Sequence, residues 1–328
     1  MKIGNRLLRQ LCAVFSLVLC ASITGAALAQ SYPNKPIRII LTVPPGAGLD
    51  IAARMVGDKL ASASGQPVII DNRGGASGQI ATEAVIKAPP DGYTLLMTTV
   101  SHAINPSINR KLSYDPVKDF APITQVTAQG FLIVAHPSVP ARTLKDFIAL
   151  AKSKKGGLVY GTAGIGVAGH LGMELLKTQA RFDAVHVPYK GGGPAIIDLI
   201  AGQVDAAMVS MPALLPHVKS GKATGLAVTS LKRSALLPDL ATVAESGFPG
   251  YEVSSWYGLL APAGTPREVV AKLHGIVSRS LKLPDVRDLV AAGGSYAVGS
   301  TPQEFSAYIQ AEMIKWGKVA RQSGARMD

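Results

Sequence analysis

Three loops of the sequence have the composition of an anion-binding site. Pro45-Gly-Ala-Gly-Leu49 separates a β-branched run from a helical pattern, and Thr162-Ala-Gly-Ile-Gly166 does the same later in the chain. Thr99, Ser101 and His102 follow another apolar run. A tight turn at a helix start exposes backbone N–H groups at the positive end of the helix dipole, where anions bind. The loops therefore predict anion binding, although Pro45–Leu49 taken alone could equally be a plain turn.

The later glycine loop also has the spacing of a dinucleotide fingerprint. Gly164-Ile-Gly-Val-Ala-Gly169 matches G-x-G-x-x-G and follows a predicted strand. The fingerprint needs an acidic residue at the end of the next strand to bind the ribose. Here that strand ends in Lys190. We therefore expect the loop to hold a simple anion, and we expect no cofactor.

Signals for catalysis and for metal binding are weak. Gly75-Ala-Ser-Gly-Gln79 lacks the last glycine of G-x-S-x-G, and no S-x-x-K occurs. The six histidines show no H-x-x-H or H-E-x-x-H spacing, so we expect no metal site. His102 and His170 could each donate to a ligand or be hydrogen-bonded parts of the core. We expect no catalytic residue.

An alternation of strands and helices brings these loops together. Strands are predicted at 37–43, 67–71 and 93–99, and a second series at 131–135, 158–160, 184–187, 204–209 and 225–229. This order, with helices between the strands, predicts two doubly wound α/β units. Ligands of such folds bind at the carboxyl ends of the strands, which is where all three loops fall.

The last part of the chain is predicted to return to the first unit. Beyond 254–261 only helices are predicted, and Thr265-Pro-Arg-Glu268 and Thr301-Pro-Gln-Glu304 have the form of capping boxes at two of their starts. Helices without a sheet must pack on an earlier one, so the chain should cross near 122–132 and again near 251–260. We expect lobe 1 to comprise residues 30–129 and 254–328, lobe 2 to comprise residues 130–253, and the crossings to form a two-stranded hinge.

Residues 1–29 have the form of a secretory signal. Three basic residues precede an apolar run, and Ala27-Leu-Ala29 offers small residues for cleavage. We expect export and cleavage after Ala29, with a retained anchor helix as the alternative. Cys12 and Cys20 would leave with this segment, so the mature chain would have neither a disulfide nor a thiol nucleophile.

The charge balance suits a small anionic ligand better than nucleic acid. The chain has 33 basic and 21 acidic residues, and removal of three basic residues with the signal lowers the formal charge from +12 to +9. Aromatic residues make up 5% and do not alternate with basic ones, so we expect no nucleic-acid partner. The densest basic run, Lys152-Ser-Lys-Lys155, closes a predicted amphipathic helix, where cations suit the dipole.

Several segments spread over the mature chain together form a specific pattern. They are Tyr32-Pro-Asn-Lys-Pro-Ile-Arg-Ile-Ile40, Pro44-Pro-Gly46 with Asp50, Pro90-Asp-Gly-Tyr-Thr-Leu-Leu96, Val187-Pro-Tyr-Lys-Gly-Gly-Gly-Pro-Ala195, Ser220-Gly-Lys222, Leu237-Pro-Asp-Leu-Ala-Thr-Val-Ala-Glu-Ser-Gly247 and Trp256 through Pro266. In this order they resemble the Bug family, the substrate receptors of tripartite tricarboxylate transporters.

The resemblance implies a type II periplasmic-binding-protein fold, with two lobes that close over a small organic carboxylate. It further implies a periplasmic receptor, which we expect to be a monomer, that delivers its ligand to a membrane permease. In the family the loop after the first strand and the glycine loop of the second lobe supply most ligand contacts. With the hydroxyl-rich strand end, the expected ligand-binding residues are Pro45, Gly46, Ala47, Gly48, Leu49, Thr99, Ser101, His102, Thr162, Gly164, Ile165 and Gly166.

The sequence departs from the family pattern at two positions. Ala47 stands where the family usually has glycine, and Thr162 where it usually has serine. Ala47 and Leu49 make the first loop apolar, which suits a ligand with a hydrocarbon or aromatic body. Two other functions stay open beside transport: an orphan carboxylate sensor that signals to a membrane partner, and an exported hydrolase.

Overall fold

The computed structural model describes residues 32–109 and 111–325. The expected signal, its cleavage after Ala29, and both cysteines lie outside the described residues. Residues up to Asn34 form a unit of their own, and all the elements below belong to the unit that begins at Lys35. No described helix is both long and apolar enough to cross a bilayer.

The described strands join one ten-stranded sheet with the central order β2-β1-β3-β9-β4-β7-β5-β6, while β10 and β8 each pair with β4. Their bounds are β1 (Ile37–Leu41), β2 (Val68–Asn72), β3 (Thr94–Thr99), β4 (Phe120–Ala135), β5 (Leu158–Thr162), β6 (Ala184–Pro188), β7 (Ala206–Ser210), β8 (Thr224–Val228), β9 (Ser254–Pro262) and β10 (Tyr296–Ala297).

The described helices are α2 (Gly48–Ser64), the short η2 (Ala76–Gly78), α3 (Gln79–Ile86), α4 (Ser101–Ile108), α5 (Leu144–Ser153), α6 (Ala168–Ala180), α7 (Gly192–Ile200), α8 (Met211–Lys219), α9 (Arg267–Ser280), α10 (Pro284–Ala292) and α11 (Pro302–Ser323). They alternate with the parallel strands of each half of the sheet, as the sequence pattern predicts.

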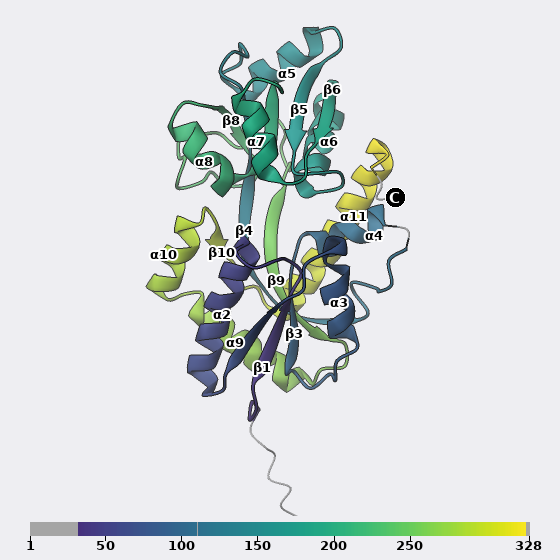
Figure 1. Ribbon diagram of the computed structural model, residues 1–328, viewed down its shortest axis with the longest axis vertical. Coiled ribbons are helices and arrows are strands. Elements are labelled where there is room, and N and C mark those ends of the chain that lie inside the picture. Colours follow the sequence, from purple (N-terminus) through teal and green to yellow (C-terminus); the bar gives the residue numbers. More distant parts are fainter. Residues whose placement is uncertain (1–31, 110, 326–328) are drawn as a thin grey trace, which may run out of the picture. The chain divides into compact units, whose positions relative to one another are not determined.

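Two long antiparallel strands connect the halves of the sheet (Figure 1). β4 pairs with β9 from Phe120 to Gly130, and from Phe131 to Ala135 it pairs with β7 and β8. On one side β1, β2 and β3 run parallel, and on the other β5 runs parallel to β6 and β7. This is the predicted type II arrangement of two doubly wound lobes joined by a two-stranded hinge. The residue limits given above for each lobe stay a prediction.

The opening strand and helix form as the sequence pattern predicts. Ile37, Ile39 and Leu41 on β1 are fully buried between the layers, as expected for a β-branched strand in a parallel sheet. Helix α2 begins at Gly48, immediately after the Pro-Pro-Gly turn, and Leu49 and Leu60 lie on its buried face. The turn is thereby placed at the carboxyl end of β1.

Three expectations about the elements were wrong. The strand expected at 131–135 begins at Phe120, because Pro122 is accommodated at a register shift of the ladder. Thr265 does not cap α9; its hydroxyl donates to Pro262 O, and α9 has no side-chain cap. The terminal region also holds a two-residue strand, β10, which pairs with β4. The capping box at Thr301 is confirmed, and Thr143 forms another at the start of α5.

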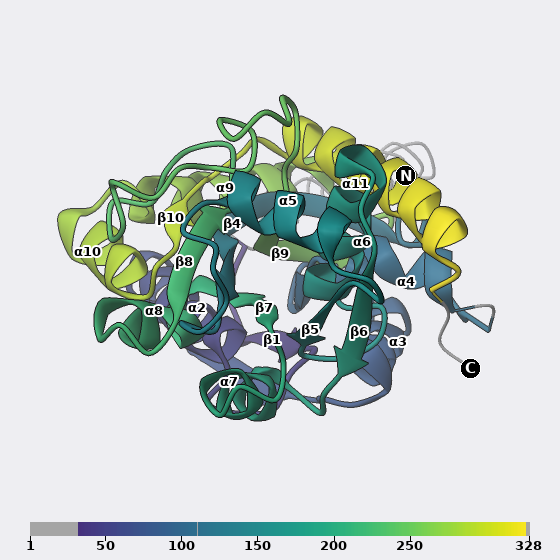
Figure 2. The same ribbon diagram turned by 90° about the horizontal axis from the view of Figure 1, so that it is seen from above.

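The terminal helices pack on earlier elements, as expected. Helix α11 packs against α4 and β4, and α9 against α2 and β4. Helices α8 and α10 lie on the same side of β4 and β9 in both views (Figures 1 and 2). Together with α2 they line a cavity that is described below.

Candidate functional site

A cleft of about 410 Å³ lies where the two halves of the sheet face each other, beside the carboxyl ends of β3 and β7. Residues at the N-terminal ends of five described helices line it: Gly48 and Leu49 of α2, Ser101 of α4, Ala168 and Gly169 of α6, Gly192 and Gly193 of α7, and Ser210 at the start of α8. The cleft is therefore built from helix starts contributed by both halves.

The electrostatic character of this cleft comes from the backbone. None of the five helices has a side-chain cap, and the first N–H groups of a helix have no partner within the helix. The amide of Ser101 donates to Thr99 Oγ1 at 3.3 Å. Among the described residues, no Asp, Glu, Lys, Arg, His or Cys side chain lines the cleft. Helix dipoles with positive ends at one small volume favour an anion there without any cationic side chain.

Asp50 fixes the turn that precedes α2. Its carboxylate is buried and accepts hydrogen bonds from Gly46 N–H at 3.0 Å, Arg54 Nε at 3.2 Å and Asn72 Nδ2 at 3.1 Å. Burial alone would raise the pKa of Asp50, but the hydrogen bonds from Gly46, Arg54 and Asn72 outweigh burial and hold the pKa below its usual value. Asp50 also forms an ion pair with Arg54, one helical turn later, at 3.1 Å.

The structure brings part of the first predicted loop to the cleft. Ala47, Gly48 and Leu49 line it, whereas Pro45 and Gly46 do not. Ala47 is the N-cap of α2 with extended backbone angles, which any L-residue adopts, so its methyl group fits without strain. Gly48 is the constrained position, because a Cβ there would lie 2.6 Å from the Tyr257 hydroxyl oxygen.

The three residues predicted at the end of β3 divide between the cleft and the core. Thr99 and Ser101 line the cleft. His102 is 1% exposed, its Nε2 lies 2.9 Å from Pro116 O, and its ring packs against Tyr114 and Phe120. Burial lowers the pKa of His102 to about 4, so the ring is neutral at physiological pH. The structure therefore places His102 in the core, which was the alternative left open for it.

The second predicted loop lies beside the cleft but uses its polar groups internally. Ala163 lines the cleft, whereas Thr162, Gly164, Ile165 and Gly166 do not. The Thr162 hydroxyl is fully buried, 2.7 Å from His186 Nε2, and donates to Gly164 O at 3.0 Å. Ligand contacts by these four residues stay a prediction.

Two histidines with stacked rings form hydrogen bonds with this loop. The rings of His170 and His186 lie 4.0 Å apart, and Gly166 N–H donates to His170 Nδ1 at 3.1 Å. Burial lowers the pKa of His170, and burial followed by repulsion from His170 and Lys177 lowers the pKa of His186 to about 3. Both rings are therefore neutral at physiological pH, and an unprotonated Nδ1 can accept from Gly166.

The sequence interpretation missed several residues of the cleft. Gly192 and Gly193 were seen only as part of a family segment, and Ser210 could have been found because it ends a parallel strand, β7. Phe131 and Tyr257 lie on the crossing strands β4 and β9. No sequence signal indicates which faces of these strands meet the cleft.

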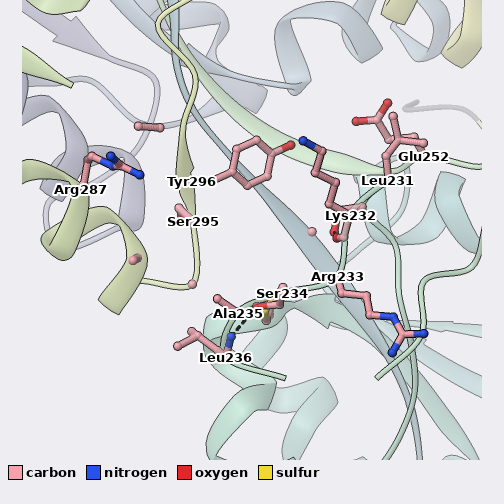
Figure 3. A pocket seen from close by; sticks show the side chains of 16 residues that line it. Leu231, Lys232, Arg233, Ser234, Ala235, Leu236, Glu252, Arg287, Ser295 and Tyr296 are labelled. Atoms are coloured by element: carbon pink, nitrogen blue, oxygen red, sulfur yellow. Dashed lines mark hydrogen bonds between the residues drawn. The ribbon is translucent and has the colours of Figure 1, made fainter. Parts of the chain in front are cut away.

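Two further cavities continue from the cleft, one adjoining it and the next adjoining the first. One, of about 460 Å³, shares Gly48, Ser210, Ala213 and Tyr257 with the cleft, and we call it the lateral annex. The next, of about 550 Å³, meets the annex at Ser295 and is lined by polar residues of loop 230–236 and by α10 and β10 (Figure 3). In Figure 3 Lys232 extends toward Tyr296, while Arg233 points away to its partner Glu245 at 2.8 Å.

Among residues 32–109 and 111–325 no group of three or more His, Cys, Asp or Glu side chains could hold a metal ion. The hydroxyls in the cleft belong to Thr99, Ser101, Ser210, Ser255 and Tyr257. Hydroxyls and backbone amides can bind and orient an anion. The described lining includes none of the His, Glu, Asp, Lys or Cys side chains that act in general acid–base catalysis, and burial raises the pKa of Tyr257, which disfavours its ionised form.

Comparisons with known proteins agree with this fold. The family described as "Tripartite tricarboxylate transporter family receptor" matches residues 52–325. Protein BugT of Bordetella pertussis is 33% identical over 321 residues, covering 97% of this chain and 98% of that protein. An R. palustris protein solved with adipate is 36% identical, with a TM-score of 0.78 over 90% of this chain and 100% of that one.

MatC from Rhodopseudomonas palustris, solved with bound malate, is 31% identical, with a TM-score of 0.72 over 88% of this chain and 99% of that one. The family match covers well over half of the sequence, and the relatives match along nearly their whole length. This chain belongs to the receptor family of the tripartite tricarboxylate transporters.

Proposed function

We propose that this protein is a periplasmic receptor that binds a small organic carboxylate in the cleft and delivers it to a tripartite-type membrane permease. The observation that carries the proposal is the convergence of five uncapped helix N-termini on a cleft without charged side chains. Such a cleft favours an anion through partial charges fixed in the fold. A carboxylate matches it, because each oxygen can accept several N–H or O–H bonds.

Relatives support the class of ligand. The similar R. palustris protein was solved with adipate and MatC with malate, and both ligands carry carboxylates. The lining of the cleft offers no acid–base pair or thiolate, which favours capture and release of an unchanged ligand over catalysis. We accordingly propose that the protein is not an enzyme.

A thermal-shift screen tests the proposal. The panel pairs mono- and dicarboxylates with the amide of each acid, which has a similar shape but no charge. A carboxylate present at about 100 times its dissociation constant should stabilise the protein by about 2.7 kcal/mol. Shifts produced only by sugars, cations or the neutral amides would refute carboxylate recognition.

A second measurement separates a receptor from a hydrolase. The protein is incubated with a saturating amount of any carboxylate that raises the melting temperature, and the ligand is recovered and analysed by mass spectrometry. Full recovery of unchanged ligand is expected. A product that forms in proportion to protein concentration would identify an enzyme.

A further inference from the structure

The lateral annex differs from the cleft in the side chains that it presents. Apart from the four residues that it shares with the cleft, its walls are mainly apolar side chains of three helices: Ile51, Ala52 and Met55 of α2, Pro212 of α8, and Leu289 and Val290 of α10. In the part of the chain that the structure describes, no Asp, Glu, Lys, Arg or His side chain lines it. Its volume of about 460 Å³ is within the usual range of roughly 300–1,000 Å³ for ligand pockets.

Helix α2 connects the two spaces directly. Gly48, its first residue, lines both, and Ile51 and Met55 then follow at helical spacing along the wall of the annex. The rise of 1.5 Å per residue places Met55 about 10 Å along the axis from Gly48. An anionic group at the N-terminus of α2 would therefore have an apolar wall of about that length beside it.

Thr127 and Gln129 of β4 bring polar side chains to the hinge side of the annex, and Gln129 is engaged with its neighbours. Ser295 Oγ donates to Gln129 Oε1 at 3.1 Å, and Gln129 also forms a hydrogen bond with Tyr257. A second carboxylate enclosed by the annex walls would meet no cationic side chain among the described lining residues. Burial of an ionised group without a partner is strongly unfavourable.

Two large apolar side chains in the annex are open to solvent. Ile51 is 54% exposed and Leu289 is 49% exposed, although they stand on helices far apart in sequence and line one cavity. Covering such side chains with an apolar group removes their surface from water and is favourable. Because these side chains lie beside the cleft, the group that covers them would be part of the ligand that binds in the cleft.

We propose that the annex receives the uncharged body of the ligand, so that the preferred ligand is a monocarboxylate carried on an aromatic ring or a hydrocarbon chain. The inference rests on the proposed function, because the carboxylate end is placed in the cleft. The inference narrows the ligand class, because it excludes a second charged group at the end of the ligand that lies in the annex.

Isothermal titration calorimetry with matched ligands tests the inference. Hexanoate and adipate have the same chain length and differ in the second carboxylate, while propanoate and 3-phenylpropanoate differ in the apolar body. We expect hexanoate to bind at least about ten-fold more tightly than adipate, and 3-phenylpropanoate at least about ten-fold more tightly than propanoate, as is typical of a hydrophobic pocket. Tighter binding of adipate than of hexanoate would overturn the inference and leave carboxylate recognition standing.

The amides of the same acids separate the two proposals. If hexanamide binds as tightly as hexanoate, carboxylate recognition fails while the apolar annex is retained. If none of the four acids binds, the inference about the annex fails, and carboxylate recognition is decided by the wider thermal-shift panel.

Variants of the annex locate the effect. Ile51→Ser and Leu289→Ser change exposed positions, so the fold should persist, which circular dichroism and the melting temperature verify. Each should weaken binding of hexanoate and 3-phenylpropanoate several-fold and leave binding of propanoate unchanged. Ile314→Ser, on a 75% exposed position of α11 that lines neither cavity, is the matched control. The assignment of the ligand's apolar body to the annex would be refuted if a variant lost affinity equally for all three ligands, or if the control variant lost as much affinity as the annex variants.

Discussion

The hydroxyl oxygen of Tyr257 lies so close to Gly48 that a Cβ on the glycine would be 2.6 Å from it. Gly48 is the first residue of α2, and Tyr257 is on the hinge strand β9. Both line the cleft and the annex. The absence of a side chain at residue 48 thus allows a hinge residue to contact the N-terminal end of α2.

This contact predicts a specific coupling between two substitutions. Gly48→Ala should lower the free energy of unfolding by about 1–3 kcal/mol, the usual cost of overpacking. Tyr257→Phe removes the hydroxyl, and the nearest remaining ring atom would be 3.6 Å from the new Cβ, an ordinary contact. In that background Gly48→Ala should cost much less, as a urea-denaturation double-mutant cycle would measure. An equal cost in both backgrounds would show that the contact does not constrain residue 48.

Asp50 gives a second prediction. Asp50→Asn weakens the acceptor of Gly46 N–H and Arg54 and should lower the free energy of unfolding by about 1.5–3 kcal/mol, the range for hydrogen bonds to charged groups. Asp58→Asn, on the exposed face of the same helix, is the control and should change the free energy of unfolding little. Folding lowers the pKa of Asp50 from its usual value of 3.8. The difference in the free energy of unfolding between wild type and Asp50→Asn should therefore be constant at pH values above 3.8 and should decrease as the pH falls below 3.8. A wild-type-like Asp50→Asn protein at pH 7 would contradict the role of this carboxylate.

The sequence pattern identified the elements of the site better than the side chains that face it. The β-branched run and the helical spacing around Pro44–Gly48 predict β1, the turn and α2, because local periodicity decides them. Both crossings were placed correctly, but the full length of β4 was hidden by Pro122, which a register shift accommodates.

Burial and facing direction depend on distant parts of the chain and could not be read from local pattern. His102 follows a strand end as a ligand donor would, yet residues 114–120 cover it. Tyr257 reaches the cleft only because β9 pairs between β3 and β4. The sequence could therefore predict which element carries each of these two residues, but not which other residues each one contacts.

Two histidines whose pKa values are lowered by folding predict how stability depends on pH. Folding lowers the pKa of His102 from 6.5 to about 4 and of His186 from 6.5 to about 3, so the unfolded chain binds these protons first. Their contribution to stability is therefore complete above pH 6.5 and is lost as the pH falls toward 4 and then 3. Each group can add a slope of at most about 1.4 kcal/mol per pH unit.

Two substitutions test the origin of this slope. His102→Gln and His186→Gln should each flatten the dependence of the free energy of unfolding on pH between 6 and 4.5, measured by urea denaturation. The two sites belong to separate clusters, so their effects should add. A slope unchanged in the double variant would assign the acid sensitivity to other groups.

Binding of a ligand should bring the two halves of the sheet together about the β4–β9 hinge. A ligand in the cleft touches helix starts on both sides, and it can shift the protein only toward the state in which it makes more contacts. In the mature chain, which would be free of native cysteine, spin labels can be attached at Ala63→Cys on α2 and Lys219→Cys on α8. The distance between them, measured by pulsed electron resonance, should shorten when a saturating carboxylate is added. Labels at Ala63→Cys and Lys87→Cys, both beside the β1–β3 part of the sheet, should keep their distance. An unchanged distance between residues 63 and 219, with binding confirmed calorimetrically on the same sample, would mean that the lobes are already closed or that the ligand occupies one side alone.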